Sequence, residues 1–278
     1  MNLIKSTGTF SFFTIISRLL GYLRDILIAI FLGTSYLADV FFVAFRIPNT
    51  FRRLFSEGTF NAAFIPSYSL ETFKGKKKSN KFANEVFSFL FLILLILILL
   101  VQIFMSTFVS LIAPGFIDDN EKMNLAINLT RITIPFLMFI SLASFFSAIL
   151  NSHNRFAEAA AAPIILNIVL IIVLLFGKSL NDDLVYYLSY GVTLAGLMQL
   201  MFLYFFVKKN FKLTFDIQFK VSNKIKVFFK KLLPSIFSSG VTQINILVGT
   251  IIASFQASAV SYLYYADRIY QINLAIAG

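Results

Sequence analysis

The sequence predicts an all-α, polytopic integral membrane protein, and three observations carry this prediction. Hydrophobic residues make up 58% of the 278 positions and charged residues only 13%, whereas a soluble domain carries about 25% charged residues. Mean hydropathy is +0.83. Two long runs, 86–101 and 163–176, contain no charged residue at all. An outer-membrane barrel would show strands of about 10 alternating residues instead, so we expect helical spans.

About eight transmembrane helices follow from the apolar stretches of the chain. Their expected bounds are 8–33, 36–66, 84–113, 124–151, 157–177, 184–208, 228–255 and 259–278. The two charge-free runs form the centres of the third and fifth elements. The last element reaches Gly278 while still apolar, so we expect the chain to be a fragment of a longer protein.

The first element is amphipathic inside the membrane. It contains Arg18, Arg24 and Asp25, although a central Arg or Asp costs about 2.5–3.5 kcal/mol on insertion scales. At 100° per residue these three share an arc of roughly 120° with Ser17 and Gly21. One wall of this helix should therefore face a polar lumen, and the apolar wall should meet lipid or other helices.

The second element also carries charges. Asp39 and Arg46 share one helix face, and Pro48 should bend the helix because its ring removes a backbone donor. Arg52, Arg53 and Glu57 follow the bend.

These charges have two explanations. They could pair with one another, for example Arg18 with Asp25 or Asp39 with Arg46, and merely lock helices together. Counting Asp267 and Arg268 of the last element, however, six arginines face only four acids. The surplus favours an anionic ligand, since arginine binds phosphate and carboxylate in bidentate geometry.

The distribution of lysine and arginine predicts the orientation. The basic residues concentrate in the loops on the side of the N-terminus, at Lys74–Lys81, Arg155 and Lys208–Lys231. The other side offers only Lys122, Arg131 and Lys178. The positive-inside rule then places the N-terminus in the cytoplasm.

The region before the seventh element alternates polar and apolar residues from Phe211 to Val221. Period two indicates an extended segment, which we interpret as a linker on the inner membrane surface. Lys224–Lys231 would then run along the interface before the helix enters the bilayer. An ordinary basic loop is the alternative.

A weak internal repeat favours a two-lobed plan. The segment 41–47 reappears as 264–269, at an offset of about 222 residues. Two six-helix lobes related by duplication would explain this spacing, and chance similarity between apolar segments would also explain it.

Several classes of function are disfavoured. With no Cys and a single His, the chain offers neither a zinc site nor a Cys/His nucleophile, and we expect no metal and no cofactor. No Gly-rich nucleotide loop is present. The net charge of +11 is ordinary for basic membrane loops, so nucleic acid is not an expected partner.

Several motifs resemble the MurJ (MviN) family of lipid II flippases. They are Ser17-Arg18-Leu19-Leu20-Gly21-Tyr22-Leu23-Arg24-Asp25, Ala38–Asn49, Phe51–Gly58, Ala113-Pro114-Gly115-Phe116, Ile149-Leu150-Asn151 and Tyr264-Tyr265-Ala266-Asp267-Arg268. The resemblance covers the whole chain and implies the first eight of about fourteen helices. It divides the chain into an N-terminal six-helix lobe (1–210), a cytoplasmic interfacial linker (211–227) and the start of a second lobe (228–278).

The resemblance also implies a function. It implies the multidrug/oligosaccharidyl-lipid/polysaccharide exporter fold in the bacterial inner membrane. The cargo would be lipid II, the undecaprenyl-pyrophosphate-linked peptidoglycan precursor, moved to the outer leaflet by alternating access. The alternative is a flippase for another polyprenyl-linked oligosaccharide or a related exporter. A membrane enzyme acting on polyprenyl phosphates and a scaffold for cell-wall machinery also remain open. Membrane lipids are further partners, and cell-wall synthesis machinery stays open as one.

The same resemblance assigns roles to individual residues. Arg18, Arg24, Arg52 and Arg268 would bind the substrate in a cationic cavity. Asp25, Asp39 and Glu57 would be functional acids. Asp25 and Asp39 would pair with the arginines when the site is empty.

Overall fold

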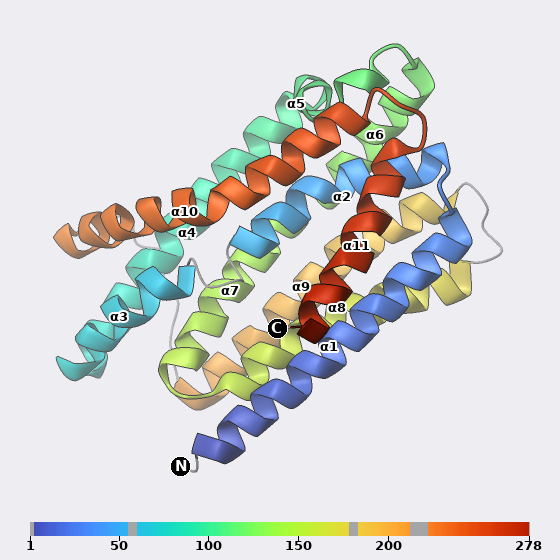
Figure 1. Ribbon diagram of the computed structural model, residues 1–278. Helices are drawn as coiled ribbons and strands as arrows, with labels where there is room; N and C mark the ends of the chain where they lie inside the picture. Colours follow the sequence, from blue (N-terminus) through green and yellow to red (C-terminus); the bar gives the residue numbers. More distant parts are fainter. Residues whose placement is uncertain (1–2, 55–59, 178–182, 212–221, 278) are drawn as a thin grey trace.

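The computed structural model describes residues 3–54, 60–177, 183–211 and 222–277, and these residues form a bundle of helices (Figure 1). The helices are α1 (Leu3–Leu32), α2 (Tyr36–Leu54), α3 (Phe60–Phe73), α4 (Lys76–Ile103), α5 (Met105–Ile112), the 3-10 helix η2 (Pro114–Phe116), α6 (Asn120–Thr133), α7 (Phe136–Ser152), α8 (Phe156–Phe176), α9 (Leu184–Phe211), α10 (Asn223–Ala253) and α11 (Ala259–Ala277). No strand occurs among the described residues.

Within the described part of the chain, four stretches are long and apolar enough to cross a membrane: Lys76–Ile103, Asn120–Ser152, Phe156–Phe176 and Leu184–Phe211. The second of these combines α6 and α7, which meet at Pro135. Large apolar side chains of α1, including Phe12, Leu19 and Ile30, are exposed on its outer wall. The polytopic, all-α prediction is confirmed.

Several predicted bounds differ from the observed ones. The element predicted at 36–66 comprises two helices, with α2 ending at Leu54 and α3 starting at Phe60. Pro48 lies inside α2, which continues to Leu54, and the bend expected at this proline stays a prediction. The element predicted at 84–113 begins earlier, at Lys76, because Gly75 adopts φ 111° and separates it from α3. It also ends earlier, at Ile103, and α5 follows separately.

The seventh predicted element also starts earlier. The side chain of Ser222 accepts a hydrogen bond from the backbone N–H of Ile225 and caps α10, so the lysines from Lys224 onward are helical. Most of the segment predicted to be extended lies outside the described residues, and Phe211 ends α9.

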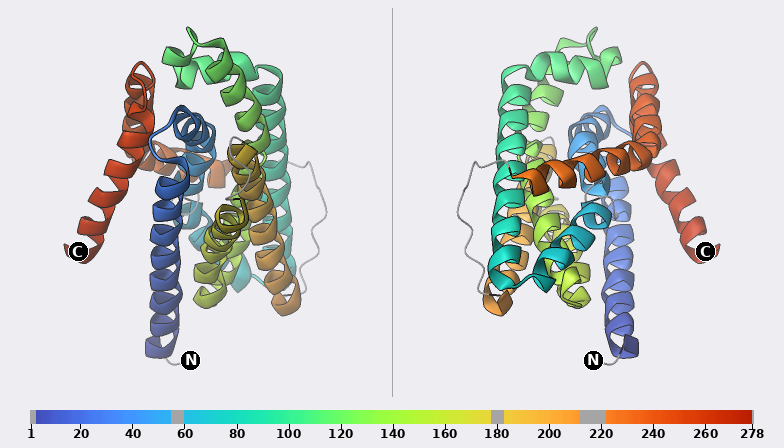
Figure 2. Two further views of the ribbon diagram at one scale, coloured as in Figure 1. Left: turned by 90° about the vertical axis from the view of Figure 1, so that its right-hand side faces the viewer. Right: turned by 90° about the vertical axis from the view of Figure 1, so that its left-hand side faces the viewer.

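The packing brings the beginning and the end of the chain together. α1 packs on α8, α8 on α9, and α9 on α7, while α11 contacts both α1 and α2 (Figure 1). α5 and α6 lie at one end of the molecule and the N-terminus at the other (Figure 2).

Aromatic side chains fill the junction between α2 and α11. Phe41, Phe42 and Phe45 of α2 are buried, and the ring of Phe42 stacks on that of Tyr264 at a centroid distance of 3.9 Å. Aromatic pairs of this kind contribute about 0.5–1.5 kcal/mol beyond their buried area. This junction holds the charged wall of α1 beside α11.

Candidate functional site

A cavity of about 520 Å³ opens between α1, α2, α8, α9 and α11. All five residues of the predicted polar arc of α1 line it, because 100° per residue places them on one face. The complete described lining is Ser17, Arg18, Gly21, Tyr22, Arg24, Asp25, Arg52, Pro163, Leu166, Asn167, Gln199, Arg268 and Gln271. Four arginines and a single acid, Asp25, are the charged residues of this lining.

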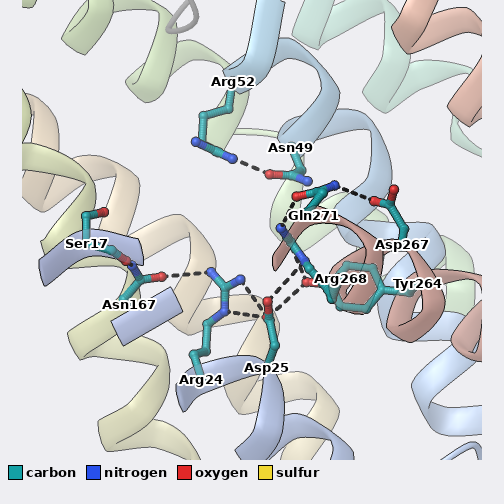
Figure 3. A network of polar contacts seen from close by, with 10 residues as sticks. All are labelled: Ser17, Arg24, Asp25, Asn49, Arg52, Asn167, Tyr264, Asp267, Arg268 and Gln271. Carbon is teal, nitrogen blue, oxygen red and sulfur yellow. Dashed lines mark hydrogen bonds and ion pairs between the residues drawn. The ribbon is translucent and has the colours of Figure 1, made fainter. Parts of the chain in front are cut away.

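Asp25 is the centre of the polar network (Figure 3). Its Oδ1 accepts hydrogen bonds from Nε and Nη2 of Arg24 at 2.9 and 2.6 Å and from the hydroxyl of Tyr264 at 3.1 Å. Its Oδ2 lies 3.0 Å from Nε of Arg268. One carboxylate on α1 is therefore shared by an arginine of its own helix and an arginine of α11.

Arg268 is held from several directions. Its Nη2 donates to the Tyr264 hydroxyl and its Nη1 to Oε1 of Gln271, both at 3.1 Å. Gln271 in turn donates to Asp267 at 2.7 Å. The guanidinium is thereby oriented toward α1 (Figure 3).

Asn167 of α8 fixes the other side of Arg24. Its Oδ1 accepts from Nη1 of Arg24, and its Nδ2 donates to the backbone carbonyl of Ser17, both at 2.9 Å. Arg24 and Asp25 are buried, with exposed fractions of 6% and 7%. A buried guanidinium bonded on both sides is preorganised, so it loses little side-chain entropy when it binds an anion.

The remaining predicted site residues occupy different places. Arg52 follows Pro48 on α2, and its Nε donates to Oδ1 of Asn49 at 3.0 Å. Arg18 lines the more open part of the cavity, where it is exposed. Glu57 lies outside the described residues, and so does the side chain of Arg53.

Asp39 lies away from the cavity, and the expectation that it pairs with an arginine is wrong. Its Oδ2 lies 3.3 Å from Nζ of Lys122, and its Oδ1 accepts from the backbone N–H of Ser261 at 2.8 Å. Asp39 and Arg46 are seven residues apart on one helix, about 10 Å along its axis, which is too far for an ion pair. The Arg18–Asp25 pair is wrong for the same reason.

Asp39 belongs to a group of contacts that we call the Asp39 cluster: Asp39, Gly115, Lys122, Ser254 and Ser261. The backbone N–H of Gly115 donates to Oγ of Ser254 at 3.0 Å. A Cβ at position 115 would lie 2.3 Å from the carbonyl oxygen of Ser254, so only glycine fits. The cluster joins α2, η2 and α6 to the end of α10 and the start of α11.

A second group, the Glu71 cluster, comprises Glu71, Lys74, Glu85, Ser222 and Lys224. The carboxylate of Glu71 lies 2.6 Å from Lys224 and 2.8 Å from Lys74. The hydroxyl of Ser222 donates to Glu85. Because the 28 residues of α4 rise about 42 Å, the start of α4 beside this cluster lies far from its end beside α5 and α6.

Glu71 and His153 lie outside the apolar spans and have shifted pKa values. Hydrogen bonds from Lys224 and then Lys74 lower the pKa of Glu71 below its ordinary value of 4.5. Burial lowers the pKa of His153, whose Nε2 lies 3.3 Å from the hydroxyl of Tyr68 and whose ring stacks on Phe211. His153 thus joins the ends of α3, α7 and α9, away from the cavity.

The cavity is suited to binding an anion. Guanidinium groups from α1, α2 and α11 converge on one space, and Asp25 is the single carboxylate among the described residues that line it. Among the residues that the structure describes, no group of three His, Asp or Glu side chains is placed to hold a metal ion.

The family model described as "Lipid II flippase MurJ" matches residues 28–278. The chain belongs to the MurJ family. Curated MurJ relatives named "Probable lipid II flippase MurJ" are 40% identical in Rhizobium tropici and in Rickettsia prowazekii. The alignments cover all of this chain but only 53% and 55% of those proteins, so the chain spans about half the length of its MurJ relatives.

Solved structures agree with this assignment. A structure named "Lipid II flippase MurJ, inward closed conformation" is 31% identical, has a TM-score of 0.81, and is matched over 95% of this chain and 54% of that one. A MOP superfamily transporter from Pyrococcus furiosus is 18% identical, with a TM-score of 0.67 over 96% of this chain and 60% of that one. The second match shows the fold alone and confirms the predicted exporter fold of the MurJ family.

Sequence reasoning missed the uncharged members of the site. Asn167 and Gln199 are single amides inside apolar helices, and that isolation was the available signal. A buried amide in a membrane span requires a partner, so each could have been marked as a candidate. Tyr264 was noted in the repeated segment and in a motif of the family resemblance, but it was given no role in the site.

Proposed function

We propose that this chain binds the diphosphate of a polyprenyl-linked cell-wall precursor, lipid II, and takes part in moving it to the outer leaflet. The convergence of Arg18, Arg24, Arg52 and Arg268 on one cavity carries the proposal. Arginine forks match the oxygens of a diphosphate. The names of the MurJ relatives support lipid II as the cargo.

In the proposed mechanism the cargo exchanges partners with Asp25. In the structure this carboxylate occupies the guanidinium groups of Arg24 and Arg268. An entering diphosphate would compete for the same N–H donors, so it would weaken the link between α1 and α11. Binding of cargo would then bias the equilibrium between two arrangements of these helices.

The two contact clusters are the proposed gates. The Asp39 cluster and the Glu71 cluster each tie α10 or α11 to the preceding helices, toward opposite ends of the bundle. Alternating access requires that one opens while the other stays closed. Similarity to a structure named inward closed supports a state with the cytoplasmic gate shut.

We further propose a bacterial inner-membrane location with a cytoplasmic N-terminus, which the lysine and arginine bias supports. The Glu71 cluster then lies on the cytoplasmic side. The division into a lobe at 1–210, a linker at 211–227 and a second lobe from 228 is part of this proposal. The chain would act as a transporter and not as an enzyme, with membrane lipids and cell-wall synthesis machinery as further partners.

The test uses cells in which this protein is the only candidate flippase. We would measure the fraction of lipid II that a membrane-impermeant reagent reaches from outside, with the unaltered chain and with Arg24→Ala. Arg131→Ala is the matched control, because Arg131 is exposed and lies outside the cavity lining. We expect the first substitution to abolish accessibility and the second to leave it unchanged.

Other outcomes would contradict the proposal. If lipid II were equally accessible from outside with and without Arg24→Ala, the assignment of the cavity as the cargo-binding site would be wrong. If lipid II stayed inside while another polyprenyl-linked sugar crossed, the cargo would be that sugar and not lipid II. Release of phosphate by the purified protein would indicate an enzyme.

A further inference from the structure

The main cavity has a small extension that its arginines do not reach. This second hollow, of about 30 Å³, is lined by residues of α3, α7, α8 and α9. Gln199 and Pro163 line both spaces, so the two adjoin. We call the second hollow the amide annex, defined by Asn61, Ile140, Ala143, Ser144, Ser147, Ala159, Ala162, Pro163, Gln199 and Leu203.

Two polar atoms in the annex are unsatisfied. Nε2 of Gln199 and Oδ1 of Asn61 are buried and have no hydrogen-bond partner among the described residues. The side chain of Gln199 is 99% buried, with 1% exposed. A buried donor or acceptor without a partner is costly, so such a pair points to a ligand that completes it.

The two atoms define the complementary chemistry. Gln199 offers an N–H donor and Asn61 a carbonyl acceptor, which together match the C=O and N–H of a secondary amide. The backbone carbonyl of Ala159 is a further acceptor, because Pro163 lacks the N–H that would donate to it within the helix.

The rest of the annex limits what can enter. Methyl groups of Ala143, Ala159 and Ala162 line it, and its described lining contains no charged side chain. At about 10–15 Å³ for each water-sized atom, 30 Å³ accommodates two or three heavy atoms. A methyl and carbonyl pair, as in an acetamido group, has this size.

We propose that the amide annex recognises a secondary amide on the head group of the anionic cargo, while the arginines hold its diphosphate. This inference rests on the proposed function. The amide has two sources in such a cargo, an acetamido substituent of the sugar or an amide of the attached peptide. Recognition of both parts would let the site reject free polyprenyl diphosphate, which supplies the anion without the amide.

The experiment measures binding to the purified full chain in nanodiscs. The probes are five forms of undecaprenyl diphosphate. One bears no sugar, and the others bear glucose, N-acetylglucosamine, the peptide-free disaccharide or the complete disaccharide-peptide. We expect amide-bearing probes to bind about 10-fold more tightly than the glucose probe, equivalent to about 1.4 kcal/mol. A preference already present for N-acetylglucosamine assigns the sugar acetamido, and one that appears only with the peptide assigns a peptide amide.

Two variants and one control test the annex itself. Gln199→Leu removes the donor, and Ala159→Val narrows the hollow while both amides remain. Each should abolish the preference, and Ala159→Val, at a residue that lines only the annex, should also leave binding of undecaprenyl diphosphate unchanged. Gln243→Leu is the matched control. Gln243, on α10, is also a buried glutamine with an unsatisfied side-chain atom, and it lines neither the main cavity nor the amide annex.

The outcomes separate the two proposals. Undecaprenyl diphosphate that does not bind, or binds equally well to Arg24→Ala, overturns the proposed function. If diphosphate binding depends on Arg24 but shows no preference for an amide, only the proposal about the amide annex is overturned. A preference that survives both annex variants overturns it as well.

Discussion

Asn167 bridges Arg24 and the backbone of α1, although 143 residues separate it from that arginine. It accepts from the guanidinium with one atom and donates to the Ser17 carbonyl with the other. The amide thereby ties the position of the charge to the position of the helix that carries it. α8 supplies no charge to the cavity, yet it determines where the central arginine lies.

Replacing this amide should weaken anion binding without unfolding the protein. Asn167→Leu keeps a similar volume in an apolar helix but removes a hydrogen bond to a charged donor. Such bonds contribute about 1.5–3 kcal/mol, so we expect a loss of about 10-fold to 100-fold in the affinity for undecaprenyl diphosphate. Calorimetry on the purified chain measures it. Asn128→Leu, at an exposed asparagine of α6, should have no effect.

Neutralising Asp25 should loosen the link between α1 and α11. Asp25→Asn leaves two arginines facing each other, and breaking a buried pair typically costs about 3–5 kcal/mol. We expect a thermal midpoint lower by about 5 °C or more. Added pyrophosphate should restore more stability to this variant than to the unaltered chain, because the anion takes the place of the carboxylate.

The control for Asp25→Asn is Asp267→Asn. It makes the same change of charge next to Arg268, but the carboxylate of Asp267 accepts from Gln271 and lies outside the cavity lining. Equal rescue of both variants by pyrophosphate would mean that Asp25 has no special relation to the anion site.

The charged wall of α1 was predictable because a charge in an apolar span is conspicuous and helical periodicity is regular. The same reasoning found Arg52 and Arg268. It could not predict which acid pairs with which arginine, because Asp25 and Arg268 come into contact only when α1 and α11 pack together. The two helices α2 and α3 were predicted as one element because apolar residues resume at Phe60, directly after the charged segment 52–57.

The repeat inferred from the sequence has a counterpart in space. Asp39 and Ser261 are 222 residues apart and in contact, and so are Phe42 and Tyr264. Contacts between residues at the repeat offset are expected where a pseudo-two-fold axis passes between two related lobes. The two-lobed plan stays a prediction, and it would place this junction of α2 and α11 near such an axis.

Gly115→Ala should open the end of the molecule that holds the Asp39 cluster. The added Cβ would lie 2.3 Å from a backbone oxygen of Ser254, so η2 and α10 must separate. Since the chain has no cysteine, spin labels on introduced cysteines at the exposed residues Glu121 and Gln256 would report the distance. We expect a longer distance. Gly8→Ala, where a Cβ meets nothing within 4 Å, is the control and should leave the distance unchanged.

Breaking the Glu71–Lys224 ion pair should release the start of α10. Glu71→Gln removes the charge that holds Lys224 against α3, so we expect faster hydrogen exchange over 223–232. Because the folded pKa of Glu71 is lowered, its stabilisation is complete above the ordinary value of 4.5 and is lost as pH falls through the folded pKa. The exchange difference between variant and unaltered chain should therefore vanish in acid.

Glu158→Gln is the matched control for this last prediction. Glu158 also pairs with a basic residue, Arg155, but both belong to one turn at the start of α8 and do not join distant helices. Its substitution should leave exchange over 223–232 unchanged. If Glu71→Gln and Glu158→Gln behaved alike, the Glu71 cluster would be an ordinary surface ion pair, contributing at most about 1 kcal/mol, and it would not act as a gate.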